Sequence, residues 1–213
     1  MIRLDIWSDP ICPWCLIGKA ALDRALESRP KHPFAIQWHP FQLNPDMPPE
    51  GMDRQEYLSL KFGEPQAVLE AYAPVVERAR AEGLTLDLPA ITRTPNTLDA
   101  HRLIHWAGLE GRQNAMVATL FRAYFREGRD IGDRAVLASL AADAGLDRAT
   151  TERLLASDAE RRETAEADRQ ARARGITGVP FFVVAGEYAV PGAQTTDLWQ
   201  RVIDDIATGQ PQP

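Results

Sequence analysis

Cysteine is scarce in this chain, with Cys12 and Cys15 the only two among 213 residues. Two cysteines three positions apart cannot form the several crosslinks of a disulfide-stapled secreted scaffold, so their role must be local. The chain also lacks a second cysteine pair, and its four histidines are scattered, which leaves too few ligands for a tetrahedral zinc site. We therefore predict no metal ion, with zinc binding as the weaker alternative for the pair.

An excess of positive charge and long apolar runs are absent as well. The 24 Lys and Arg residues are outnumbered by 30 Asp and Glu, for a net charge of −6, so neither nucleic acid nor an anionic membrane is expected as a partner. No uncharged apolar run approaches the ~18 residues of a membrane-spanning helix. No secretory signal pattern is visible at the start of the chain. These absences predict a cytoplasmic protein.

What is present is an α/β pattern that a long helical stretch interrupts. The predicted strands span 2–7, 34–39, 181–184 and 188–190, and the helices beside them span 13–28 and 196–207. Prolines and glycines break the periodicity over 44–51, and helical patterns then follow one another up to the second group of strands. We therefore predict a thioredoxin-sized α/β core of residues 1–45 and 175–213, with an all-helical domain of about six helices inserted over residues 46–174. Its last helix, over 158–174, carries charges separated only by alanines and is expected to be solvated.

The two cysteines lie in a Cys-Pro-Trp-Cys motif that follows the first predicted strand and begins the first helix. A helix N-terminus stabilises an anion, so a thiolate at Cys12 is favoured and its pKa is expected below ~8.5. Cys12 would then be the nucleophile in thiol–disulfide exchange, and Cys15, one turn inside the helix, the buried resolving thiol. Pro13 suits the first helical position, and we interpret Trp14 as an apolar platform that faces substrate. Inert structural cysteines are the alternative.

A proline stands at the head of the strand predicted over 181–184. Pro180 cannot donate a hydrogen bond to a sheet, and its bond to Val179 is a candidate cis peptide in a tight approach. An ordinary proline at a strand start is the alternative interpretation. Pro180 alone is a weak signal.

Taken together, these features resemble a known family. The Cys-Pro-Trp-Cys helix start, the Val-Pro-Phe-Phe-Val strand and the helical insert between them are similar to thioredoxin-fold proteins of the DsbA family. The segments at 8–15, 38–41, 96–103 and 177–180 resemble its FrnE-like branch. The resemblance implies a thiol–disulfide oxidoreductase or isomerase in which a cis Pro180 lies beside Cys12. It also implies that the backbone of Val179 is offered to an extended substrate.

The resemblance also sets the expected partners and the main alternative. It implies protein or peptide thiols and disulfides as partners, with glutathione as a further co-substrate, no bound cofactor beyond the redox pair, and a monomer or homodimer. The related glutathione-dependent 2-hydroxychromene-2-carboxylate isomerases and kappa-class glutathione transferases have a serine where Cys12 stands. A glutathione-dependent isomerase or transferase acting on a small molecule is therefore the alternative function. A redox-inactive binding module is the third hypothesis.

Three further side chains have roles that the sequence leaves open. The resemblance suggests Asp5 as a proton acceptor for Cys15, and an ordinary exposed strand aspartate is the alternative. His39 either helps to polarise the thiolate or is structural. His101 is followed four residues later by His105, a spacing that suits a metal only with a third ligand. We take His101 as a candidate substrate-binding residue, with a hydrogen-bonded structural histidine as the alternative.

Overall fold

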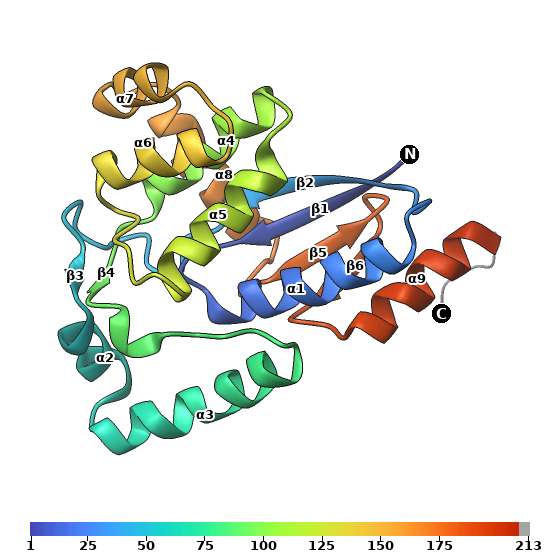
Figure 1. Ribbon diagram of the computed structural model, residues 1–213, viewed down its shortest axis with the longest axis horizontal. Coiled ribbons are helices and arrows are strands. Elements are labelled where there is room, and N and C mark those ends of the chain that lie inside the picture. The colour runs from blue at the N-terminus through green and yellow to red at the C-terminus, as the bar shows by residue number, and fades with distance from the viewer. Residues whose placement is uncertain (209–213) are drawn as a thin grey trace.

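The computed structural model describes residues 1–208 and builds its main sheet from the two ends of the chain (Figure 1). The strands are β1 (Ile2–Ser8), β2 (Phe34–Pro40), β5 (Phe181–Val184) and β6 (Tyr188–Pro191), in the spatial order β2-β1-β5-β6. β1 pairs parallel with β2 and antiparallel with β5, and β5 pairs antiparallel with β6. The predicted α/β core is thus present, with β1 in the interior of the sheet. Residues 209–213 of the predicted core lie outside the described residues.

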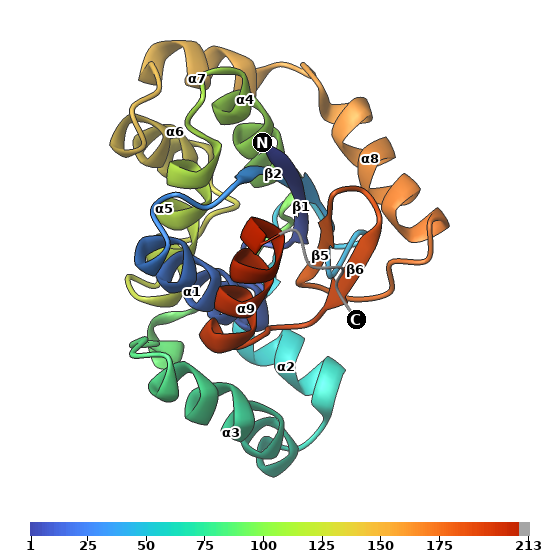
Figure 2. The same ribbon diagram turned by 90° about the vertical axis from the view of Figure 1, so that its right-hand side faces the viewer.

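Helices cover both faces of this sheet. α1 (Pro13–Ser28) and α9 (Thr196–Thr208) pack together on one face, and α8 (Arg161–Ala173) lies on the other (Figure 2). On the α1 side, Leu4 and Ile6 of β1 are completely buried. Because successive side chains of a strand point to opposite faces, these two residues are directed toward α1, in the same hydrophobic cluster as Leu22. The alternation that predicted β1 therefore has its physical basis in this packing.

The inserted segment between β2 and β5 is almost entirely helical. Besides α8 it contains α2 (Arg54–Phe62), α3 (Pro65–Ala81), a 3-10 turn (Leu88–Ala90), α4 (Leu98–Leu109), α5 (Gln113–Phe125), α6 (Arg134–Asp143) and α7 (Arg148–Ala156). Two strands of two residues each, β3 (Met52–Asp53) and β4 (Arg93–Thr94), form a small second sheet that the sequence pattern did not indicate. Asp53, Asp133 and Asp147 cap the helices that follow them, as expected for aspartate at a helix start.

The inserted helices share one core with the sheet. The buried face of α5, which includes Met116, Leu120 and Tyr124, belongs to the same hydrophobic cluster as Leu4 and Ile6. Figure 1 shows α4, α5, α6 and α7 gathered on one side of the sheet, away from α2 and α3. The apolar stripe predicted on α5 is thus a core face that joins the insert to the sheet.

Helix α8 differs from its prediction. It was expected to be solvated over 158–174, but Thr164, Asp168 and Ala171 are buried on one face, and the helix packs against β2. The helix also begins later than the charged pattern suggested, after Glu160 in a left-handed conformation. The burial of α8 was not predicted because its buried face consists of small and polar side chains, which carry no hydrophobic signal.

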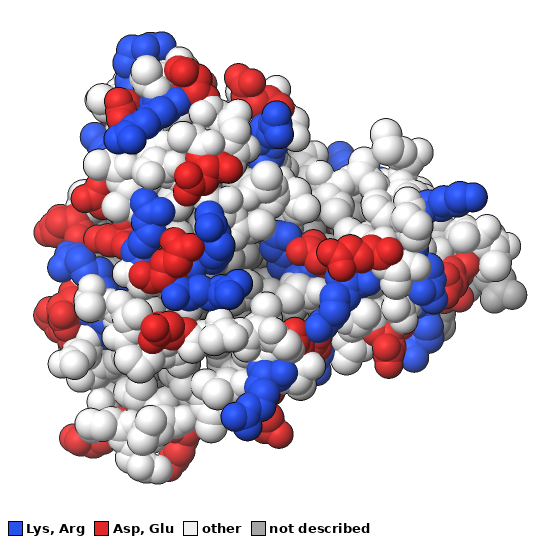
Figure 3. Space-filling view, viewed as in Figure 1, with Lys and Arg blue, Asp and Glu red and all other residues white. Residues whose placement is uncertain are grey.

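The surface carries charges of both signs. Acidic and basic side chains are interspersed over the face shown in Figure 3. None of the helices within residues 1–208 is long and apolar enough to cross a membrane.

Candidate active site

Cys12 lies at the N-terminus of α1, as the motif predicted. It is the N-cap residue, in an extended conformation, and Pro13 follows as the first helical residue. Its backbone N–H donates to the carbonyl of Asp9 (2.9 Å), and its Sγ accepts from the backbone N–H of Cys15 (3.4 Å). The N–H of Cys15, which also donates to the carbonyl of Cys12 (3.1 Å), therefore points toward the sulfur from the first turn of the helix. Cys12 and Cys15 are both free thiols.

The chain brings Val179 to Cys12 from 167 positions away. The Cys12 thiol contacts the carbonyl oxygen of Val179 at 3.6 Å, and the Val179–Pro180 peptide bond is cis. Pro180 is buried against α1 at Gly18, where a Cβ would lie 3.1 Å from the proline ring. The absence of a side chain at Gly18 lets the Pro180 loop approach the helix that carries both cysteines.

Trp14 and Cys15 differ in how far they are covered. Trp14 is half-buried and packs between the main core and a small cluster that contains Ile17 of α1 and Val75 of α3. Part of its ring therefore belongs to the core. Cys15 is 1% exposed. Burial is the main cause that raises the pKa of Cys15 well above its ordinary value, and the neighbouring Cys12 is the second. Ser8 and the backbone of Asp9 act to lower it. Cys15 is therefore a protonated thiol at neutral pH, in keeping with a resolving position.

A family model described as the DSBA-like thioredoxin domain matches residues 3–204. The chain belongs to this family. The crystal structure of a probable DsbA oxidoreductase from Streptomyces coelicolor is 32% identical, with a TM-score of 0.84, and the match covers 100% of this chain and 92% of that one. YwbO, an uncharacterized protein of Bacillus subtilis, is 28% identical over 209 residues, which are 96% of each chain.

A third likeness concerns the fold alone. Cytosolic disulfide reductase DsbM from Pseudomonas aeruginosa, solved with GSH, has a TM-score of 0.70 at 20% identity, with 97% of this chain and 99% of that chain covered. The predicted family and the predicted thioredoxin-like fold with its helical insertion are thus confirmed.

Asp5 of this DsbA-like chain is buried, so the interpretation as an exposed strand aspartate is wrong. It is 3% exposed, and its carboxylate accepts a hydrogen bond from Nε of Arg3 (2.6 Å) and is hydrogen-bonded to Nε2 of His39 (2.7 Å). It lies on the strand face opposite Leu4 and Ile6, which pack in the same cluster as both cysteines. Burial lowers the pKa of His39, and the bond to Asp5 opposes that change. His39 thus binds a carboxylate on the far side of the sheet from the thiols.

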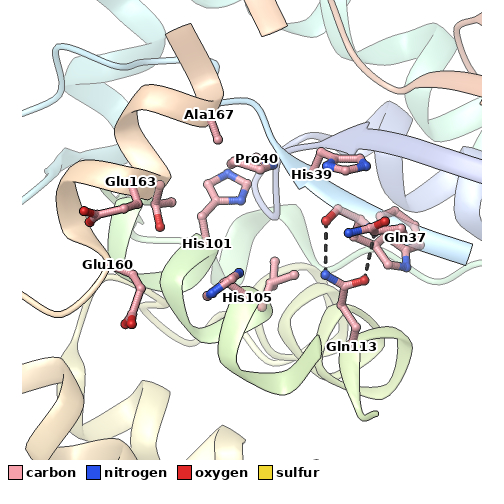
Figure 4. A pocket seen from close by; sticks show the side chains of 12 residues that line it. Gln37, His39, Pro40, His101, His105, Gln113, Glu160, Glu163 and Ala167 are labelled. Atoms are coloured by element: carbon pink, nitrogen blue, oxygen red, sulfur yellow. Dashed lines mark hydrogen bonds between the residues drawn. The ribbon is translucent and has the colours of Figure 1, made fainter. Parts of the chain in front are cut away.

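His101 lies behind the active-site loop and lines a cavity. This cavity has a volume of about 210 Å³ and lies between β2, α4 and α8, with His39 and His105 also in its wall (Figure 4). Nε2 of His101 is 3.8 Å from Oδ1 of Asp9 and has no hydrogen-bond partner among the described residues. Burial lowers the pKa of His101 to about 4, so the ring is neutral at neutral pH.

Asp9 is a buried carboxyl group that the sequence analysis missed. It is 0% exposed, and its oxygens accept from the backbone N–H of Leu43 (2.6 Å) and of Ile11 (3.4 Å). Burial raises the pKa of Asp9 to about 7. In the sequence, an aspartate before a proline is typical of a turn. The signal that could have identified Asp9 as part of the site was its position three residues before Cys12.

Within residues 1–208, no group of three or more His, Cys, Asp or Glu side chains is arranged to hold a metal ion. The His101 and His105 pair therefore has no third ligand in this part of the chain.

Proposed function

We propose that this chain catalyses thiol–disulfide exchange, with Cys12 as the nucleophile and Cys15 as the resolving thiol. The observation that carries the proposal is the position of the Cys12 sulfur, between the N–H of Cys15 at the helix start and the carbonyl of Val179. The helix N-terminus stabilises a thiolate there, and a thiolate is the reactive form in exchange. Membership of a thioredoxin-fold family with oxidoreductase relatives supports the same chemistry.

The exchange proceeds in two displacements. The Cys12 thiolate attacks a substrate disulfide, so that one substrate sulfur leaves as a thiolate and a mixed disulfide forms on Cys12. Cys15 then loses its proton and attacks the sulfur of Cys12. The second substrate thiolate leaves and takes up a proton, and the enzyme is left with a Cys12–Cys15 disulfide. A second thiol compound, such as glutathione, returns both cysteines to thiols, and the reversed sequence oxidises a dithiol substrate.

The substrate site that we propose surrounds Cys12. Val179 offers its backbone to an extended substrate, the cis Pro180 shapes the wall beside it, and Pro13 with the open part of Trp14 forms the other side. His101 would meet a substrate that reaches its cavity. The fold shared with DsbM, which was solved with GSH, supports glutathione as a co-substrate, and the cytoplasm, where glutathione keeps thiols reduced, as the compartment.

Trapping of mixed disulfides tests the proposal. The Cys15→Ala variant should accumulate mixed disulfides with protein substrates because the second displacement is blocked, and the matched Cys12→Ala variant should accumulate none. The intact enzyme should reduce insulin in the presence of glutathione. If Cys15→Ala traps only glutathione, while the intact enzyme turns over glutathione-dependent small molecules and leaves protein disulfides unchanged, the isomerase or transferase alternative replaces this proposal.

A further inference from the structure

The last residue of β1 carries a buried hydroxyl. Ser8 is 5% exposed, and its Oγ has no hydrogen-bond partner among residues 1–208. Buried polar side chains are nearly always hydrogen-bonded, so an unpaired one needs an explanation. Its backbone, in contrast, is fixed: Ser8 is in register with Pro40 of β2, and its carbonyl accepts from the N–H of Phe41 (3.2 Å). The hydroxyl is thus held on a rigid element.

The direction of the Ser8 side chain follows from strand geometry. Leu4, Ile6 and Ser8 are two residues apart, so their side chains lie on the same face of β1. Leu4 and Ile6 pack in the cluster that contains Cys15. Ser8 is the side chain that acts to lower the pKa of Cys15, against the effect of burial. The unpaired hydroxyl therefore lies on the face of β1 that is directed toward α1 and Cys15.

We propose that Ser8 is a positioning residue for the resolving step: its hydroxyl donates a hydrogen bond to the thiolate of Cys15 as that thiolate attacks Cys12. This inference rests on the exchange function proposed above. In the resting enzyme Cys15 is a neutral thiol, a weak acceptor, and the hydroxyl stays unpaired. When Cys15 loses its proton, the buried thiolate needs donors, and Ser8 and the backbone N–H of Asp9 are the groups that lower its pKa.

The reaction with an aromatic disulfide, dithiobis(nitrobenzoate), separates the two displacements. Attack by Cys12 releases the first equivalent of coloured thionitrobenzoate and leaves the other on Cys12 as a mixed disulfide. Attack by Cys15 forms the Cys12–Cys15 disulfide and releases the second equivalent. Stopped-flow absorbance therefore reports the nucleophile and the resolving thiol as two phases of one experiment, and the pH dependence of the second phase reports the ionisation of Cys15.

The variants are chosen so that the hydroxyl is the variable. Ser8→Ala should slow the second phase about tenfold at neutral pH and move its pH profile upward by about one unit, as expected for a lost hydrogen bond to a charged group, with the first phase unchanged. Ser8→Thr and Ser8→Val have the same shape, and only the threonine keeps the hydroxyl. Ser8→Thr should therefore resolve about tenfold faster than Ser8→Val. Thr151→Val removes another buried hydroxyl, on α7, and should change neither phase.

Three results would overturn the role of Ser8. Equal second-phase rates and pH profiles for Ser8→Thr and Ser8→Val would show that the hydroxyl does not act on Cys15. Equal slowing of both phases in Ser8→Ala would show a general disturbance of the active-site loop. Release of only one equivalent by the unmodified protein would refute the exchange function itself, and the role of Ser8 with it.

Discussion

Asp9 and His101 are expected to have opposite effects on stability as the pH changes. Both are buried, with Nε2 of His101 3.8 Å from Oδ1 of Asp9, and Asp9 belongs to the loop that leads to Cys12. Asp168 faces both groups, and Arg172 binds Asp168. Replacing one member of the pair, as in His101→Gln or Asp9→Asn, should make the effect of the other on the pH dependence of the unfolding free energy measurable.

The sign of each effect follows from its pKa in the folded and unfolded chain. Asp9 has a pKa of about 7 when folded against 3.8 when unfolded, so its contribution to stability is complete below about pH 4 and is lost as the pH rises to 7. His101 has a pKa of about 4 when folded against 6.5, so its contribution is present above pH 6.5 and is lost as the pH falls toward 4. Between pH 4 and 6.5 the two contributions change in opposite directions and nearly cancel.

The magnitudes are large enough to measure. At ~1.4 kcal/mol per pH unit, the two pKa values of Asp9 correspond to about 4 kcal/mol and those of His101 to about 3 kcal/mol. Relative to the unmodified protein, His101→Gln should therefore lose up to about 3 kcal/mol of unfolding free energy as the pH rises from 4 to 6.5. Asp9→Asn should gain up to about 4 kcal/mol from pH 4 to 7, also relative to the unmodified protein.

Urea unfolding of the three proteins at intervals between pH 4 and 8 gives these differences directly, because the other titrating groups are common to all three. NMR titration of the His101 ring provides an independent pKa. A free-energy difference between His101→Gln and the unmodified protein that stays constant across this pH range would refute the reasoning, as would a ring that titrates near pH 6.5.

Three further substitutions test the packing by urea unfolding. Arg102→Met removes a fully buried guanidinium that binds Asp99 and three backbone carbonyls, and should cost ~3–5 kcal/mol; a loss below ~1 kcal/mol would contradict this. Gly128→Ala should cost ~1–3 kcal/mol more than Gly63→Ala, since both glycines have positive φ but a Cβ at Gly128 alone collides with backbone. Trp199→Ala, which empties the space beside Phe182, should cost ~3–5 kcal/mol without slowing the reaction of Cys12 with dithiobis(nitrobenzoate).

The sequence predicted those features that depend on local chemistry. A strand, a turn and a proline at the first helical position specify where α1 begins, and the structure places Cys12 at that N-cap. The contact between Cys12 and Val179 joins residues 167 positions apart. Spacing alone contains no information about such a contact, so the resemblance to a family was needed to predict it.

The burial of polar side chains could not be predicted in the same way. Asp5 lies in the middle of β1 and Asp9 directly after its end. The sequence gives no sign that Asp5 binds a histidine on the adjacent strand β2 while Asp9 binds the backbone of Leu43. Asp168 is buried because α8 lies against β2, and its backbone partner Gln42 is 126 positions away (2.7 Å). The burial of these carboxyl groups depends on tertiary packing, which cannot be predicted from the periodicity of the sequence.

The interior position of β1 has a consequence for the order in which the protein forms during synthesis. The ribosome makes β1 and both cysteines before β5, at residues 181–184, which is the strand that completes the sheet on one side of β1. Until β5 emerges, that edge of β1 is unpaired and Cys12 lacks its contact with Val179. The nascent chain therefore carries both thiols outside a completed active site until the residues around Val179 and β5 have been made.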